Sequence, residues 1–236
     1  MARLRGIRAV LLDYGNTLAH PAEPFDEMWA RVARERGLVL DPRRLAEARA
    51  EADRLFEIAI FEHVGRTSEF WRRYHDVLIG KLEVRDPDGL FAAAVQGAFD
   101  RPDVMRLYPE VPEVLRALRS LGLHVGVVSN NTDEIHGRLR DLGVNALFDA
   151  VTFSQEAGAN KPARPIFDLA LRRAGCAPSE AMHVGDAYEA DILGARGAGI
   201  TPVLVDREDR HPDADCLRVR DLRGIEPLIV SQRARG

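Results

Sequence analysis

The sequence predicts an α/β protein: a doubly wound parallel sheet with an inserted α-helical domain. Three observations predict it. An apolar run at residues 7–12 stops at Asp13, as a buried strand does where it reaches a turn. Residues 24–100 carry helical periodicity with Arg and Glu on the polar faces, and after Pro109 strand-like and helix-like segments alternate. Such alternation implies parallel strands joined by right-handed crossovers.

The helical insertion interrupts this pattern directly after the first strand. Pro and Gly separate four stretches with helical spacing, at residues 25–36, 42–63, 68–82 and 87–99. We therefore divide the chain into three parts. These are a core domain of residues 1–19 and 104–230, a helical domain of residues 20–103, and a tail of residues 231–236 that is expected to fray.

The rest of the core domain alternates between strands and helices. The predicted strands are residues 124–128, 150–153, 181–184 and 203–205, with a weaker one at 217–219. The predicted helices are residues 111–121, 133–142, 163–174, 189–198 and 225–230. The strand segments are mostly apolar, which is typical of a sheet covered by helices on both faces.

The composition excludes several classes of function. The chain has 236 residues, 46% of them hydrophobic, and can bury a full core; its charges nearly cancel to a net −4, so we expect no nucleic acid as a partner. The first apolar run is too short for a signal peptide or a membrane span. The two cysteines, Cys176 and Cys216, form no redox or metal motif. We therefore expect a cytoplasmic protein without a membrane partner, and no pattern indicates an oligomeric state.

Polar residues stand at or just beyond the ends of four apolar segments. Asp13 opens the string DYGNTL, Ser129 precedes two asparagines, Lys161 precedes a proline, and Asp186 stands five residues before Asp191. The carboxyl ends of the strands in a doubly wound sheet converge on one crevice, so we expect these side chains to lie together. Each segment alone is ordinary for a turn or a helix start, but four in this order predict a functional site.

Together these segments resemble the haloacid dehalogenase-like superfamily of hydrolases, in the branch with a helical cap inserted after the first motif. The resemblance rests on residues 13–18 and 127–131, on GANKPARPIF at 158–167, and on VGDAYEADILGARGAG at 184–199, so it spans nearly the whole chain. It implies a Rossmann-like core with a helical cap, a Mg²⁺ cofactor, and hydrolysis of a small phosphorylated metabolite.

The resemblance implies a nucleophile and a metal site. Asp13 would attack phosphorus and form an aspartyl-phosphate, which divides hydrolysis into two displacements. Because the anionic nucleophile and the phosphoryl group repel each other, a hard cation must bridge them. The implied Mg²⁺ ligands are Asp13, Asp186, Asp191 and the main-chain carbonyl of Gly15.

Further residues are implied to bind the phosphoryl group. Ser129 and the Lys161 ammonium would contact its oxygens and act in catalysis by positioning it and neutralising its charge. Gly15, Asn16 and Asn130 would complete the substrate-binding site, with main-chain amides near Asn130 facing the phosphoryl oxygens.

The sequence departs from the phosphatases of this superfamily at one position. Those enzymes carry a second Asp two residues after the nucleophile, which protonates the leaving oxygen and later activates water; this residue is Gly15 here. A group of that kind contributes about 10²- to 10⁴-fold in rate, so we expect a slow or specialised reaction. His20 is the first candidate for a replacement acid, followed by His63 and His75.

Three other functions stay open. A 2-haloacid dehalogenase would use no metal, but its usual tyrosine is absent from position 15, and Tyr14 should point the other way on an extended segment. A phosphonate hydrolase would need a lysine in the helical domain, for which Lys81 is the candidate. The third is a non-catalytic regulatory module that binds Mg²⁺ and phosphate.

Overall fold

The computed structural model describes the main chain of residues 6–59 and 68–233, and side chains outside 53–70 and 231–233. Contacts divide the chain into two units, Met1–His20 with Leu107–Gly236, and Pro21–Arg106. Two short strands, β2 (Ala19–Pro21) and β3 (Met105–Leu107), pair where the chain passes between the units. The sequence patterns do not predict this pair, because each strand is only three residues long.

Six strands form the sheet of the first unit, in the order β5-β4-β1-β6-β7-β8. Every pairing between neighbours is parallel, which confirms the predicted fold class. The strands are β1 (Ala9–Leu12), β4 (His124–Ser129), β5 (Ala150–Phe153), β6 (Ala181–Gly185), β7 (Thr201–Val205) and β8 (Leu217–Val219). The order reverses beside β1, so the crevice expected in a doubly wound sheet lies at the carboxyl end of this strand.

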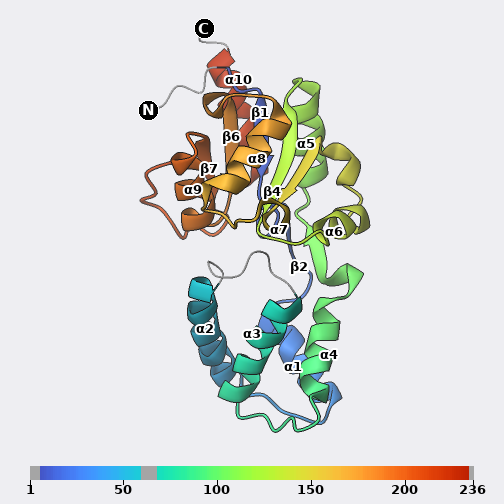
Figure 1. The fold of residues 1–236 in the computed structure, drawn as a ribbon. Coiled ribbons are helices and arrows are strands. Elements are labelled where there is room, and N and C mark those ends of the chain that lie inside the picture. The colour runs from blue at the N-terminus through green and yellow to red at the C-terminus, as the bar shows by residue number, and fades with distance from the viewer. Residues whose placement is uncertain (1–5, 60–67, 234–236) are drawn as a thin grey trace. The chain divides into compact units, whose positions relative to one another are not determined.

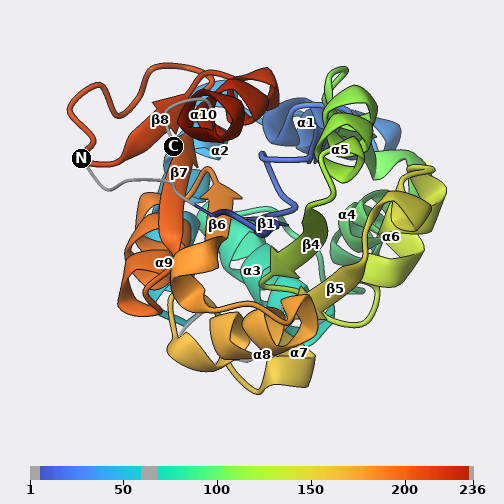
Figure 2. The ribbon, with the colours of Figure 1, turned by 90° about the horizontal axis from the view of Figure 1, so that it is seen from above.

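Helices cover both faces of the sheet, as Figure 2 shows. On one face lie α5 (Val111–Ser120) and α10 (Ile225–Arg233), and on the other lie α8 (Arg164–Ala174) and α9 (Gly194–Gly197). Two further helices, α6 (Ile135–Asp141) and α7 (Ser154–Ala157), follow β4 and β5. Because both faces are covered, all four residues of β1 are buried, and its apolar run follows from this position.

The segment after β6 contains a kind of helix that the sequence does not specify. The helix predicted over 189–198 begins as a π-helix over Tyr188–Leu193, and α9 continues from it. The N–H of Asp191 donates to the Ala187 carbonyl at 2.8 Å, and the Ala187 N–H donates to Asp191 Oδ2 at 3.0 Å. The segment is therefore helical as predicted, but its first part is a π-helix, which apolar spacing does not distinguish from an α-helix.

The second unit is built from α1 (Phe25–Glu35), α2 (Pro42–Ala59), α3 (Ser68–Lys81) and α4 (Leu90–Phe99), visible in Figure 1. Trp29 is fully buried in its core, which also contains Leu45 and Leu78. The start predicted for α4 at residue 87 is wrong. The Asp86 carboxylate accepts the N–H groups of Phe91 and Ala92, each at 2.9 Å, so the residues before Leu90 form a turn. Among the described helices, none has the length and apolar character needed to cross a bilayer.

Candidate active site

The centre of the site is the carboxyl end of β1. Asp13 follows this strand directly, and its N–H donates to the Val184 carbonyl on β6 at 2.9 Å. This bond extends the strand pairing by one residue and fixes Asp13 at the carboxyl end of the sheet. There, 8% of Asp13 is exposed. Ser129 ends the neighbouring strand β4 and is 4% exposed, while Asp186 follows β6 on the other side. The parallel topology therefore brings these three residues to one edge.

Lys161 is buried beside Asp13, with 2% of the residue exposed. Its Nζ lies 2.5 Å from Asp13 Oδ1 and 2.7 Å from Asp191 Oδ1. Asn130 fixes the main chain of Lys161, because Asn130 Oδ1 accepts the Lys161 N–H at 2.7 Å and Nδ2 donates to the Lys161 carbonyl at 3.1 Å. Burial disfavours the ammonium, but Asp13 and Asp191 raise the pKa of Lys161 above its ordinary value. The ammonium therefore stays charged.

Asp191 uses both carboxylate oxygens within the protein. Oδ1 faces Lys161 and also His183, whose Nε2 lies 2.8 Å away, while Oδ2 accepts from the N–H of Ala187, just before the π-helix. Burial alone would raise the pKa of Asp191, but the Lys161 charge and the His183 hydrogen bond hold it below its usual range. Asp191 is thus an ionised carboxylate that holds Lys161 against Asp13.

Asp186 has weaker protein partners. Its Oδ1 accepts from the Thr17 hydroxyl at 3.4 Å, and its carboxylate also receives a hydrogen bond from the Asn16 side chain. Burial, followed by the charges of Asp13 and Asp191, raises the pKa of Asp186 to about 7. Burial also raises the pKa of Asp13, against the opposing effect of Lys161. The site therefore holds more negative charge than its own cation compensates.

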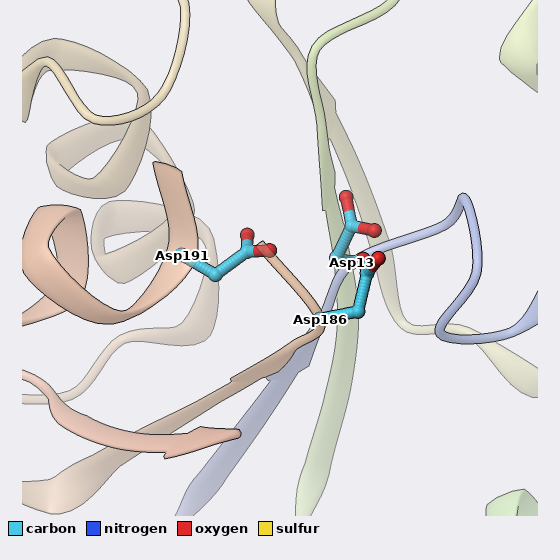
Figure 3. Close-up of side chains that lie close together, drawn as sticks. All are labelled: Asp13, Asp186 and Asp191. Carbon is cyan, nitrogen blue, oxygen red and sulfur yellow. The ribbon is translucent and has the colours of Figure 1, made fainter. Parts of the chain in front are cut away.

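The carboxylates suit a divalent cation. Asp13, Asp186 and Asp191 each place an oxygen within 4.8 Å of the others, and Figure 3 shows the three side chains converging. With the Lys161 ammonium, the ionised cluster carries two uncompensated negative charges, and carboxylate oxygens are the donors that Mg²⁺ prefers. Because both oxygens of Asp191 are bonded within the protein, Asp13 and Asp186 are the better direct ligands.

The loop after Asp13 leaves an open place at Gly15. A Cβ added to this residue would meet no atom within 4 Å. Asn16 follows with a φ of 53°, and its N–H donates to the Ala19 carbonyl at 2.7 Å. This turn directs the side chains of Asn16 and Thr17 towards Asp186. Asn16, which is predicted to bind substrate, is thus bonded to the carboxylate cluster.

Two residues that the sequence patterns did not single out support the site. Arg207, which follows β7, donates to the Thr17 carbonyl at 3.0 Å, pairs with Glu110 at 2.8 Å, and lies with its guanidinium carbon 3.4 Å from the centre of the Tyr108 ring. His183 is fully buried within β6. The available signals were an Arg just after an apolar strand and a His inside one.

The remaining candidate residues have other neighbours. The His20 ring packs against Tyr108, with ring centres 4.7 Å apart. His75 is buried within the second unit, and His63 lies outside the described residues. The Lys81 ammonium forms an ion pair with Glu51 on α2.

Comparison with known proteins finds relatives that span most of the chain. The family model for haloacid dehalogenase-like hydrolases matches residues 7–199. The chain is 33% identical over 214 residues to human haloacid dehalogenase-like hydrolase domain-containing protein 3, covering 87% of this chain and 84% of the relative. It is 32% identical over 235 residues to a glyceraldehyde 3-phosphate phosphatase of Methanopyrus kandleri, covering 93% and 97%.

The fold is also found among solved structures. The HAD-hydrolase YfnB of Bacillus subtilis, solved bound to magnesium, superposes with a TM-score of 0.76 at 18% identity, covering 96% of this chain and all of the other. At this identity the likeness concerns the fold alone. The family match over most of the chain, together with the relatives that span it, carries the assignment. This protein is a hydrolase that belongs to the haloacid dehalogenase-like family.

Proposed function

We propose that this protein is a Mg²⁺-dependent phosphatase that hydrolyses a small phosphorylated metabolite through an aspartyl-phosphate on Asp13. The observation that carries the proposal is the position of Asp13 at the end of the central strand, 2.5 Å from the buried Lys161 ammonium and within 4.8 Å of Asp186. The phosphatase name of the Methanopyrus kandleri relative supports the choice of phosphorus as the reacting atom.

Asp13 would attack phosphorus with one carboxylate oxygen, and the bond from phosphorus to the leaving oxygen would break. Lys161 would offset the negative charge of the phosphoryl oxygens, and the Ser129 hydroxyl and main-chain amides near Asn130 would orient them. Asp191 would keep Lys161 in place through its 2.7 Å contact. Water would then attack the phosphorus of the aspartyl-phosphate and regenerate the Asp13 carboxylate.

Asp13, Asp186 and the Gly15 carbonyl would hold the Mg²⁺, with Asp191 nearby. The bound ion would reduce the repulsion between the Asp13 carboxylate and the phosphoryl oxygens. It would also keep Asp186 ionised, since a cation beside a buried carboxylate favours its charged form. We place the reaction in the cytoplasm, where small phosphorylated metabolites are found and where the free thiols Cys176 and Cys216 stay reduced.

The test is phosphate release from a panel of small phosphate esters and acyl phosphates, with Mg²⁺ and with a chelator. We expect release that needs Mg²⁺ and that falls by about 10³-fold or more in Asp13→Asn, because the amide is a poor nucleophile. Asp88→Asn, at an exposed position of the helical unit, is the matched control and should keep full activity.

Other results would contradict the proposal. Halide release from 2-haloacids without metal would establish a dehalogenase, and cleavage of a carbon–phosphorus bond that depends on Lys81 would establish a phosphonate hydrolase. Binding of Mg²⁺ and a phosphate analogue without turnover of any compound would establish a regulatory module.

A further inference from the structure

We propose that the site selects phosphoryl compounds whose leaving oxygen departs as a stable anion, with acyl phosphates as the preferred class and aryl phosphates next. This inference rests on the proposed function and deepens it. It also implies that, with a good leaving group, the phosphorylated form of Asp13 is formed faster than it is hydrolysed.

The first observation is the open place at Gly15. This residue lies two positions after Asp13, in the loop that faces the carboxylate cluster, and it has no side chain. Apart from its chain neighbours Tyr14 and Asn16, no described residue has an atom within 4 Å of a Cβ built on Gly15. Among the described residues of the core unit, no proton-donating side chain therefore stands at this place.

The second observation is that the nearest polar side chains are already engaged. The Lys161 ammonium contacts the carboxylates of Asp13 and Asp191 at 2.5 and 2.7 Å. The Asn16 side chain and the Thr17 hydroxyl donate to Asp186. An amide does not transfer protons near neutral pH, and a hydroxyl bonded to a carboxylate has its proton committed. These residues hold charges in place rather than exchange protons with a leaving group.

The leaving group determines how much the lack of a proton donor slows the first step. When Asp13 attacks, the bond from phosphorus to the leaving oxygen breaks and the electron pair leaves with that oxygen. A carboxylate, whose acid has a pKa of about 4, and a phenolate, near about 10, are stable anions and need no proton in the transition state. An alkoxide is far more basic and needs one, which a positioned acid would supply with a gain of about 10²- to 10⁴-fold.

The second step lacks a base at the same place. Water attacks the phosphorus of the aspartyl-phosphate, the bond from phosphorus to Asp13 breaks, and its electron pair returns to the carboxylate. The proton of the water passes to a phosphoryl oxygen or to solvent, since no described side chain at Gly15 can take it. The second step is therefore slow relative to the first for a good leaving group, and the phosphorylated enzyme accumulates.

Transient and steady-state kinetics with Mg²⁺ test the inference, using acetyl phosphate, a series of aryl phosphates with phenols of graded pKa, and an alkyl phosphate. In the wild type we expect kcat/KM, which reports the first step, to fall steeply as the pKa of the leaving group rises. We also expect a burst of phenol equal to the concentration of sites, followed by a slower steady rate common to the good substrates.

Two substitutions at Gly15 provide the matched pair, since both fit the open place and only one carries a transferable proton. Gly15→Asp should raise kcat/KM for the alkyl phosphate by about 10²-fold or more, flatten the dependence on the leaving group, and remove the burst. Gly15→Asn should do none of these.

A wild-type kcat/KM that does not depend on the leaving group would overturn the inference, as would an equal gain in Gly15→Asn. If turnover depends on Asp13 but not on the leaving group, only this inference fails. If Asp13→Asn retains the activity, or no phosphoryl compound reacts, the proposed function fails with it.

Discussion

At the scale of single residues, the chemistry of the site depends on which carboxylate is paired with which cation. Lys161 is shared by Asp13 and Asp191, and His183 bonds the same oxygen of Asp191. Removing one partner of a buried ion pair leaves an uncompensated charge, which is strongly destabilising. This arrangement leaves Asp186 as the carboxylate whose negative charge the protein compensates least.

The sequence predicted that these residues would lie together, but not which protein partners each carboxylate would have. Parallel topology follows from the apolar runs, and it brings Asp13, Ser129 and Asp186 to one edge. The different roles of Asp186 and Asp191 depend on His183, which faces Asp191 from inside β6. That contact depends on three-dimensional packing, so the motif spacing alone could not reveal it.

His75 provides a residue-level prediction about pH. It is 1% exposed, its ring faces aromatic neighbours including Trp29 and Phe99, and neither ring nitrogen has a hydrogen-bond partner among the described residues. Burial lowers the pKa of His75 from 6.5 to about 4. Between about pH 6.5 and 4, His75 therefore binds a proton in the unfolded state but stays neutral in the folded state. The contribution of neutral His75 to the free energy of unfolding of the helical unit should be fully present above about pH 6.5. It should decrease as the pH falls towards 4, by about 3 kcal/mol in all.

Both tryptophans, Trp29 and Trp71, lie in the helical unit, so denaturant titrations followed by tryptophan fluorescence measure its free energy of unfolding. His75→Phe should lose most of the decrease between pH 6.5 and 4 that the wild type shows. An unchanged pH dependence in this variant would mean that His75 is not the group responsible.

At the scale of elements, the π-helix after β6 is the feature that the spacing of apolar residues could not predict. It carries Asp191 back over the end of β6 so closely that a Cβ added to Gly185 would lie 2.2 Å from Asp191 Cγ. Only glycine permits this approach. The absence of a side chain at Gly185 and the π-helix that follows therefore act together to set the position of Asp191.

Gly185→Ala should accordingly displace Asp191 and weaken its contact with Lys161. We expect a loss of about 1–3 kcal/mol in the free energy of unfolding, as for overpacking elsewhere, together with a large loss of activity. Denaturant unfolding of the core unit, followed by circular dichroism, measures the first effect. Gly197→Ala in α9, where a Cβ meets no atom within 4 Å, is the control and should be neutral or slightly stabilising. Equal stability of the two variants would contradict this account of Gly185.

At the scale of the whole molecule, the apolar runs and their alternation with helices predict a parallel sheet, and its six strands confirm this fold class. The patterns do not predict the short β2–β3 pair or the late start of α4. The first depends on pairing between residues 84 positions apart or more, and the second on the Asp86 carboxylate accepting from the following turn. Local periodicity carries neither kind of information.

The central claim is that Asp13 takes the phosphoryl group. It is tested most directly by incubating the wild type with acetyl phosphate and Mg²⁺, quenching in acid and mapping the modified peptide by mass spectrometry. We predict one phosphoryl group on Asp13, which appears within the first turnover, and none in Asp13→Asn. Phosphate release with Asp13 unmodified throughout, or a phosphoryl group carried by another residue, would contradict the account.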